Sequence, residues 1–338
     1  MTLTPKRVLL GLSGGVDSAA AAVKLVRAGW DVVSATVWTI GTVDEQAARS
    51  ADALGLEHHV IDRREAFRTE VIEPFVAAWE RGMTPNPCIA CNPAIKFAAL
   101  IELADRLGCE GVATGHYAKT KAGRLFRGSD RRRDQSYFLY RLPEATLQRL
   151  VLPLGDDTKE ATRALVAAVD HPAAAKKDSQ DICFLTGETL EAFLQSEGLP
   201  DRPGPFLDRA GRRLGTHRGY WRFTVGQRKL GQGFGRPMIV RAIRPGENAV
   251  ILTDADDADI TTLDVDDLVL HDPRDAMHAD VQMRSQGRPL PATIEIAPDR
   301  THARVTFDRP VRLTSPGQSA VFYEGAHVLG GGIVTDMA

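Results

Sequence analysis

Short apolar runs alternate with helix-spaced segments through the first half of the chain. The runs are bounded by glycine or polar residues, as buried strands usually are, and lie at Val8–Leu12, Val32–Val37, His58–Ile61 and Gly111–Ala113. Between them, apolar residues recur every three or four positions and predict helices at Ala19–Ala28, Glu45–Leu54 and Ile95–Leu107. This β-α alternation predicts an α/β domain with a parallel sheet covered on both faces.

The pattern changes at about Pro205 to short alternating segments separated by glycine-rich turns. Examples are Met238–Ile243, Ala249–Leu252, Ala292–Ile296, Arg304–Phe307 and Ala320–Tyr323. They predict a β-rich second half, with a small linker domain followed by a barrel. A Pro/Gly cluster at 199–205 marks the boundary. We therefore expect an α/β domain at 1–204, a small β-rich linker domain at 205–262 and a C-terminal β-barrel at 263–338.

The composition of the chain indicates where in the cell we expect the protein to act. The chain has 338 residues, of which 43% are hydrophobic and 25% charged, and no apolar run approaches the roughly 20 residues of a membrane-spanning helix. The N-terminal residues show no signal-peptide pattern, so we expect a cytoplasmic protein without a membrane partner. The four cysteines are too few to cross-link a chain of this length, so we expect chemical roles for them.

Charge is unevenly distributed although the net charge is only −2. Residues 212–246 hold nine Lys/Arg and no acid, and residues 254–272 hold eight Asp and no Lys or Arg. A second basic stretch, 119–133, holds seven Lys/Arg against one Asp. Basic segments of this kind either lie against a polyanion or form an ordinary solvated surface.

A glycine- and serine-rich loop directly follows the first predicted strand. Its residues are Gly11, Leu12, Ser13, Gly14, Gly15, Val16, Asp17 and Ser18. Adjacent glycines let backbone N–H groups turn inward, serine hydroxyls add donors, and the following helix N-terminus adds its positive dipole end. The chain contains no Walker-type loop and no dinucleotide fingerprint. The loop therefore predicts anion binding without a lysine of its own.

The loop resembles the pyrophosphate loop of the ATP pyrophosphatases, which split ATP between its α- and β-phosphates and transfer AMP to a carbonyl-type oxygen. This resemblance implies ATP as the bound nucleotide and an adenine nucleotide alpha hydrolase-like fold for the N-terminal domain. Asp17 beside the phosphates is then expected to be a Mg²⁺ ligand, on chemical grounds rather than from spacing.

Further motifs resemble those of the tRNA-specific 2-thiouridylase family and cover nearly the whole chain. They lie at 84–92 with 95–97, at 113–117, 133–139, 176–184, 223–228, 315–318 and 329–333. The resemblance implies that ATP adenylates the C2 oxygen of the wobble uridine of tRNA, after which a cysteine persulfide delivers sulfur. Position in the motifs implies that Cys183 carries the persulfide and that Cys91 is its partner nucleophile. A persulfide donor, such as a cysteine desulfurase or a relay protein, is the implied partner.

The resemblance also implies the remaining binding residues. Gly115 and Val37 are expected at the adenine–ribose end of the pocket, with Thr36 or Trp38 beside them. The tRNA anticodon arm is expected to contact Asn86, Pro87, Arg133, Asp134, Gln135 and Arg284, and the basic stretches 119–133 and 212–246. His116 is open to an acid–base or a structural role. Cys109, between a helix and a strand, is expected to be a packed apolar residue.

Cys88 departs from the family pattern, in which this position is an aspartate. Cys88 and Cys91 form a Cys-x-x-Cys pair, and Cys183 supplies a third thiol, so a four-iron four-sulfur cluster competes with the two-cysteine persulfide route. The persulfide route is preferred because the surrounding motifs match persulfide-type members. Two other functions stay open: an amide-forming synthetase with the same loop, and a non-catalytic RNA-binding protein with a degenerate nucleotide site.

Overall fold

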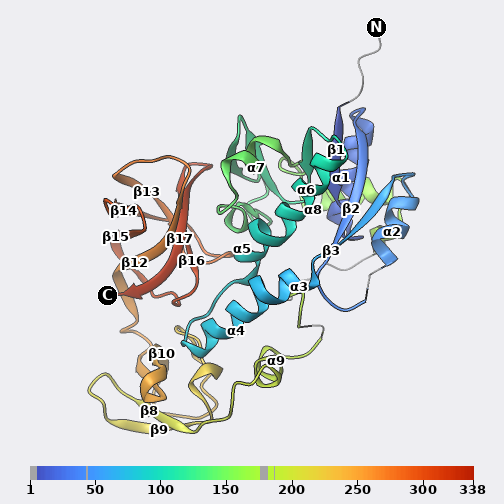
Figure 1. The fold of residues 1–338 in the computed structure, drawn as a ribbon. Coiled ribbons are helices and arrows are strands. Elements are labelled where there is room, and N and C mark those ends of the chain that lie inside the picture. The colour runs from blue at the N-terminus through green and yellow to red at the C-terminus, as the bar shows by residue number, and fades with distance from the viewer. Residues whose placement is uncertain (1–5, 43–44, 176–181, 186) are drawn as a thin grey trace. The chain divides into compact units, whose positions relative to one another are not determined.

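The computed structural model describes residues 6–42, 45–175, 182–185 and 187–338. The chain divides into two compact units. The first comprises Met1–Val71, Cys88–Asp181 and Gly325–Val328, and the second Ile72–Pro87, Ile182–Glu324 and Leu329–Ala338. The first unit holds a parallel sheet, and the second holds a small sheet and a barrel (Figure 1).

The parallel sheet has the strand order β3-β2-β1-β4-β7. Its register sets Leu10 of β1 opposite Ser34 of β2 and Ala113 of β4. Because β2 and β4 lie on opposite sides of β1, the strand order reverses there, and ligands of open α/β sheets bind at the carboxyl ends of strands at such a point. The strands are β1 (Arg7–Gly11), β2 (Asp31–Trp38), β3 (His58–Asp62), β4 (Gly111–Ala113) and β7 (Leu150–Val151).

Helices and a hairpin complete the first unit. Helix α1 packs against β1, β2 and α8, and α6 packs against β1, β2 and β4, so that both bury apolar residues against the sheet. Thr158 caps the N-terminus of α8 by accepting a hydrogen bond from the Ala161 N–H at 3.2 Å. The elements are α1 (Val16–Arg27), α2 (Glu45–Asp52), α3 (Arg64–Phe67), α5 (Pro87–Cys91), α6 (Ala98–Arg106), β5 (Ala118–Lys121), β6 (Arg124–Arg127), α7 (Glu144–Arg149) and α8 (Lys159–Ala167).

One helical stretch of the described chain, Pro87–Arg106, is long and apolar enough by length and composition to span a membrane. It comprises α5, a π-helical turn at Asn92–Phe97, and α6. Half of its apolar window is buried inside the protein, and α6 lies on the parallel sheet. Core helices pass the same test, so the stretch is weak evidence for a membrane span.

The second unit is mainly antiparallel. A small sheet has the order β10-β11-β8-β9, and the barrel strands follow the order β12-β15-β14-β13-β16-β17, with a further β12–β17 pairing that closes it. Buried residues alternate along its strands, as with Leu263 and Val265 on β12, and their side chains fill the interior. The elements are α4 (Glu73–Glu80), α9 (Leu190–Ser196), β8 (Gly204–Leu207), β9 (Arg213–His217), β10 (Met238–Arg244), β11 (Ala249–Asp254), β12 (Asp259–Leu270), β13 (Ala276–Gln282), β14 (Leu290–Ile296), β15 (His302–Arg312), β16 (Ser319–Glu324) and β17 (His327–Met337).

The predicted fold class is confirmed: a parallel α/β domain precedes a small β-rich part and a closed β-barrel. Helix α1 begins at Val16, three residues before the expected start, because the loop itself leads into the first turn. The hairpin β5–β6 and strand β7 were missed. Both are short, and the basic residues of 119–133 hide the hairpin's alternation.

Candidate active site

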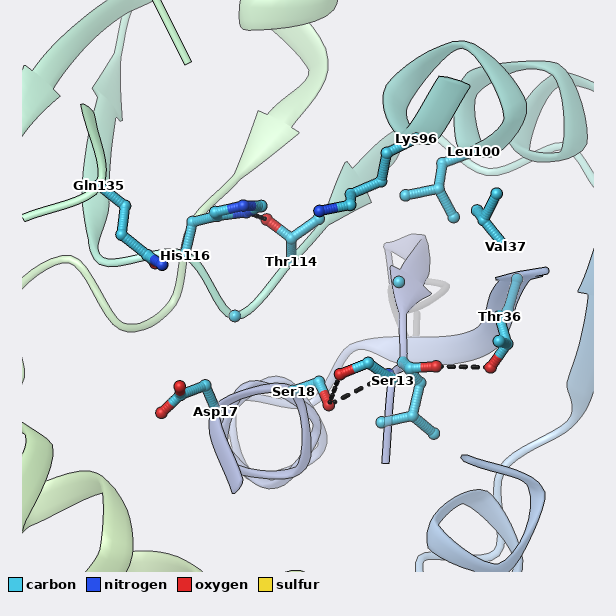
Figure 2. A pocket seen from close by; sticks show the side chains of 14 residues that line it. Ser13, Asp17, Ser18, Thr36, Val37, Lys96, Leu100, Thr114, His116 and Gln135 are labelled. Carbon is cyan, nitrogen blue, oxygen red and sulfur yellow. Dashed lines mark hydrogen bonds between the residues drawn. The ribbon is translucent and has the colours of Figure 1, made fainter. Parts of the chain in front are cut away.

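A pocket of about 220 Å³ opens at the carboxyl ends of β1, β2 and β4, where the strand order reverses (Figure 2). The predicted loop supplies one side of it, and β4 and the turn after it supply another. The lining residues are Gly11, Leu12, Ser13, Asp17, Ser18, Ala35, Thr36, Val37, Lys96, Leu100, Thr114, Gly115, His116 and Gln135. The pocket thus combines an apolar wall with groups that bind anions.

The loop is held by its own side chains. The Ser13 N–H donates to Ser18 Oγ at 3.2 Å, and Ser18 Oγ donates to the Gly15 carbonyl at 3.0 Å. Thr36 Oγ donates to the Leu12 carbonyl at 2.6 Å and ties the loop to β2. These bonds fix a turn at the N-terminus of α1, where backbone N–H groups and the helix dipole favour an anion.

Gly115 is needed for close approach between β4 and α1. A Cβ atom at this position would lie 2.6 Å from the Asp17 carbonyl carbon and 2.8 Å from the Ser18 nitrogen. Backbone cannot move aside as a flexible side chain can, so any larger residue would push the end of β4 away from the loop. Gly115 therefore sets the width of the pocket.

Asp17, which was expected to be a Mg²⁺ ligand, is bonded to two side chains that the sequence did not link to it. Lys159 of α8 donates to both of its carboxylate oxygens, at 2.7 and 2.9 Å, and the Tyr117 hydroxyl donates to one of them at 2.8 Å. The Lys159 side chain is only 6% exposed. Burial, with the charge of Asp17, raises the pKa of Tyr117 above its usual range, so this hydroxyl stays a donor. Through these bonds, Lys159 and Tyr117 hold Asp17 and so fix the first turn of α1.

Lys96 reaches the pocket from the helical turn that follows Cys91 (Figure 2). It forms no ion pair with any residue the structure describes. Its charge lowers the pKa of His116 and acts to lower that of Cys88, which places the ammonium group near both. Lys96 thus supplies the unpaired positive charge that the loop lacks.

His116 is held neutral. It retains some exposed area in the pocket, but protein atoms surround its imidazole, and this burial, with Lys96 as second cause, lowers its pKa to about 3. Its ring stacks on Phe97 with centroids 5.9 Å apart, and Nδ1 lies 2.7 Å from the Thr114 hydroxyl. A neutral, packed ring favours the structural role over that of an acid at neutral pH.

His116 should therefore give the protein a measurable pH dependence of stability. In the unfolded chain this histidine takes up a proton near pH 6.5, whereas in the folded protein it does so only near pH 3. Above pH 6.5, His116 is neutral in both states and does not lower the free energy of unfolding. Below pH 6.5, the unfolded chain binds a proton that the folded protein does not, so the free energy of unfolding falls as the pH drops towards 3. From pH 7 to pH 5, the free energy of unfolding measured in urea should fall by up to about 2 kcal/mol less for His116→Gln than for the wild type. Equal losses would show that His116 titrates normally.

The cysteines occupy different environments. Cys88 and Cys91 lie three residues apart on α5, hence on the same side of that helix, and Cys88 is exposed while Cys91 is half-buried. Although Cys88 is exposed, desolvation by nearby protein raises its thiol pKa, and Lys96 offsets this in part. Cys183 lies in the other unit and is exposed. Cys109 is 5% exposed within the core, which confirms its predicted packing role.

Asp134 and Gln135, which precede Tyr137 in the 133–139 motif, have different roles in the structure. Asp134 has a side chain only 5% exposed, pairs with Arg127 at 3.2 Å and accepts from the Gly128 and Ser136 N–H groups. It therefore stabilises the turn after β6, and these bonds leave it little capacity for RNA. Gln135 accepts from the Tyr117 N–H at 2.9 Å and lines the pocket.

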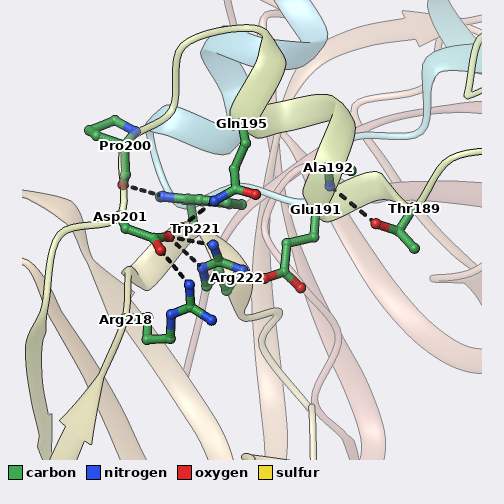
Figure 3. Close-up of polar contacts among 9 residues, drawn as sticks. All are labelled: Thr189, Glu191, Ala192, Gln195, Pro200, Asp201, Arg218, Trp221 and Arg222. Atoms are coloured by element: carbon green, nitrogen blue, oxygen red, sulfur yellow. Dashed lines mark hydrogen bonds and ion pairs between the residues drawn. The ribbon is translucent and has the colours of Figure 1, made fainter.

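Five of the nine Lys/Arg in the basic stretch 212–246 pair with carboxylates of the described chain, and Arg222, the most enclosed of the five, is poorly placed to contact RNA. The Arg222 side chain is 8% exposed, stacks on Trp221 and pairs with Asp201 and Glu191 (Figure 3). Asp201 also pairs with Arg218 at 2.6 Å. Other basic residues of the stretch that pair with carboxylates are Arg212, Arg236 and Arg244. A run of basic residues in the sequence predicts local positive charge, but it does not show which carboxylates pair with those residues in the fold.

The remaining predicted positions lie outside the pocket. Gly14, Gly15 and Val16 belong to the loop and the start of α1 but do not line it. Arg133 and Arg284 are exposed, whereas Pro87 is buried. The 176–184 motif is described only from residue 182 onward. Lys96 lies within the 95–97 motif, but the sequence alone gives it no role. Lys159 carries no local pattern that would predict one.

A parallel sheet with a glycine–serine loop at its switch point, and a lysine facing that loop, defines a nucleotide-binding enzyme domain of the pyrophosphate-loop class. Three family models match in succession: the tRNA methyl transferase HUP domain at 6–187, the tRNA methyl transferase PRC-barrel domain at 191–254 and the Aminomethyltransferase beta-barrel domain at 260–334.

Curated relatives extend over nearly the full length. The tRNA-specific 2-thiouridylase MnmA of Sorangium cellulosum (strain So ce56) is 42% identical over 353 residues, covering 96% of this chain and 91% of the relative. The protein of the same name from Carboxydothermus hydrogenoformans is 41% identical over 358 residues, covering 97% of each. The chain belongs to the tRNA-specific 2-thiouridylase family, as its motifs predicted.

Solved structures show weaker likeness. A 4-thiouridine synthetase in complex with RNA and ATP aligns with a TM-score of 0.38 and 15% identity, covering 57% of this chain and 50% of that one. The NMN synthetase of Francisella tularensis aligns with a TM-score of 0.34 and 17% identity, covering 51% of this chain and 66% of that one. Scores of this size do not discriminate between activities.

Proposed function

We propose that this protein uses ATP to replace the C2 oxygen of the wobble uridine in tRNA by sulfur. The observation that carries the proposal is the pocket, in which a lysine-free anion loop faces Lys96 across the switch point of the sheet, in a chain that matches 2-thiouridylases over nearly its whole length. The family models describe methyl transferase domains, but the loop is suited to ATP phosphates.

The first half-reaction is adenylation. The uridine C2 oxygen bonds to the α-phosphorus of ATP, and the bond to the leaving pyrophosphate breaks. The loop N–H groups and the N-terminus of α1 stabilise negative charge on the pyrophosphate, and Lys96 holds the α-phosphate. AMP on the oxygen makes C2 electrophilic and provides its leaving group. The target base must first leave the anticodon stack, because C2 is otherwise out of reach.

The second half-reaction is sulfur transfer by two cysteines. The terminal sulfur of a persulfide on Cys183 attacks C2, and AMP leaves with the oxygen. Cys91 then attacks the Cys183 sulfur, which releases the transferred sulfur on the base and leaves a disulfide that an external thiol reduces. Cys88 is a bystander in this scheme because the raised pKa of its thiol lowers its thiolate fraction at neutral pH.

The residues present favour one source of Mg²⁺ over another. Lys159 already offsets the charge of Asp17, so we propose that Mg²⁺ enters with the nucleotide's phosphates, and Asp17 can add a further ligand through its remaining lone pairs. No group of three or more His, Cys, Asp or Glu side chains in the described chain is arranged to hold a metal ion. A four-iron four-sulfur cluster on Cys88, Cys91 and Cys183 is kept as the competing proposal.

The remaining assignments follow from this function. The tRNA contacts proposed are Asn86, Pro87, Arg133, Gln135 and Arg284, and a persulfide-bearing protein is the proposed donor in the cytoplasm. The division at 1–204, 205–262 and 263–338 is kept as a proposal. The three successive family models support three parts, while β12, which begins at Asp259, favours placing the second boundary a few residues earlier.

A pyrophosphate-release assay with and without unfractionated tRNA separates this function from its rivals. A tRNA thiolase releases pyrophosphate from ATP only when tRNA is present. An amide-forming synthetase releases it with a small acid substrate and ignores tRNA. A non-catalytic RNA-binding protein binds tRNA and releases none.

Lys96→Met should weaken ATP and AMP binding by about ten- to a hundredfold, the usual scale for losing a hydrogen bond to a charged group. Adenosine affinity should be unchanged, because the variant removes only the α-phosphate contact. Calorimetric titration of the three ligands measures this, with exposed Lys121→Met as matched control. Equal losses for adenosine and AMP would indicate a collapsed pocket, and unchanged AMP binding would remove Lys96 from the α-phosphate.

A further inference from the structure

A second pocket, of about 430 Å³, lies entirely within the second unit. It is bounded by the turn after α4, by β10, by the 315–318 turn and by the end of β17. Its lining residues are Arg81, Gly82, Met83, Val225, Arg241, Ala242, Ile243, Pro316, Thr335, Asp336 and Met337. Neither the nucleotide pocket nor the proposed sulfur transfer uses it.

Three motifs that were singled out in the sequence, but that the nucleotide site does not use, meet beside this pocket. The Thr84 N–H donates to the Pro316 carbonyl at 2.7 Å, and Gln318 Nε2 donates to the Thr84 carbonyl at 2.6 Å. Ser315 Oγ donates to Thr84 Oγ1 at 3.0 Å, and Thr84 Oγ1 donates to Thr224 Oγ1 at 3.3 Å. The network fixes the segment after α4 against two distant parts of the chain.

Gly82 brings the turn after α4 against β10. Its φ of +72° is a left-handed conformation, and a Cβ there would lie 2.9 Å from Ile243 Cγ2. Glycine alone meets both conditions without strain. The turn therefore places Arg81 beside the strand that carries Arg241, and both arginines line one cavity.

Neither arginine forms an ion pair with a described residue, whereas Arg222, Arg236 and Arg244 of the same unit do. Arg241 is half-buried, and its guanidinium has one long bond, 3.4 Å, to the Met337 carbonyl. A half-buried unpaired charge is costly unless an anion meets it. Asp336 also lines the pocket, which leaves two positive charges against one negative.

We propose that Arg81 and Arg241 form a binding site for a backbone phosphate of tRNA. Planar guanidinium groups bind phosphate through two parallel hydrogen bonds, and most protein contacts to nucleic acid go to the phosphates. The site rests on the proposed tRNA substrate. Arg81 is followed within a few residues by Asn86 and Pro87, so a phosphate held here guides the RNA to the segment that leads to Cys88 and Cys91.

The test measures the affinity of the full-length protein for unfractionated tRNA over a range of salt concentrations. Arg81→Gln with Arg241→Gln should weaken binding roughly tenfold and make the salt dependence shallower by about one counterion per lost contact. Asp336→Asn should tighten binding, a gain that misfolding cannot produce. Arg309→Gln, an exposed and unpaired arginine of β15 among the described residues, is the matched control and should change neither property appreciably.

The outcomes are distinguishable. If the wild type fails to bind tRNA, the proposed function itself fails. If the wild type binds and the double variant shows the same affinity and salt slope, the phosphate site is wrong while the function stands. If tRNA binding is unchanged but sulfur transfer from a persulfide-bearing protein is lost, the pocket docks the donor, which also overturns the proposal.

Discussion

Cys91→Ser and Cys183→Ser should each reduce 2-thiolation of tRNA to background while leaving tRNA-dependent pyrophosphate release intact. The reason is that adenylation needs the loop and Lys96, whereas sulfur transfer needs a persulfide on one cysteine and a thiolate on the other. The two readouts are quantification of 2-thiouridine by mass spectrometry and pyrophosphate release in the same reactions. Loss of both in either variant would contradict the division of the two half-reactions.

The variants Cys88→Ser and Cys109→Ala provide the controls. Cys109 is buried in the core, so Cys109→Ala tests the general effect of removing a thiol. Cys88→Ser should retain most activity under the persulfide route. Anaerobic purification with iron and acid-labile sulfide analysis decides the alternative, because a stoichiometric cluster that disappears in Cys88→Ser would overturn this route and favour the iron–sulfur mechanism.

Gly115→Ala should abolish ATP binding and therefore all activity, although it adds a single methyl group. The new Cβ would lie 2.6–2.8 Å from backbone atoms of Asp17 and Ser18, so the end of β4 and the loop must separate. Overpacking of this kind costs about 1–3 kcal/mol in stability, which a folded protein of this size can tolerate. Calorimetric titration with ATP and a thermal unfolding curve measure the two effects.

Gly246→Ala is the matched control for that substitution. A Cβ at Gly246 meets no described atom within 4 Å, so ATP affinity and melting temperature should stay near those of the wild type. If Gly115→Ala bound ATP as tightly as this control, the close approach of β4 and α1 would not define the nucleotide pocket.

Features with a local signature could be predicted from the sequence. Strand β4 was placed at Gly111–Ala113 as observed, and the loop before α1 lies where its glycines and serines indicated. Cys109 was correctly assigned to the core, because a helix-to-strand junction buries small residues. These predictions depend on residues that are neighbours in the chain.

Pairings between distant residues could not be predicted. Lys159 meets Asp17 across 142 positions, so the carboxylate that was predicted as a Mg²⁺ ligand also anchors the first turn of α1. Arg222 lies in a run without acids, but the fold brings Asp201 and Glu191 to it. Asp134 likewise is buried by Arg127. A charge pattern fixes what a segment carries, whereas the tertiary structure decides which charges remain unpaired.

The account is tested most directly by analysing the nucleosides of tRNA after incubation with the protein, ATP and a persulfide donor. It predicts 2-thiouridine at the wobble position, with one AMP and one pyrophosphate formed for each sulfur incorporated. A methylated uridine, or hydrolysis of ATP to ADP without incorporation of sulfur, would contradict it.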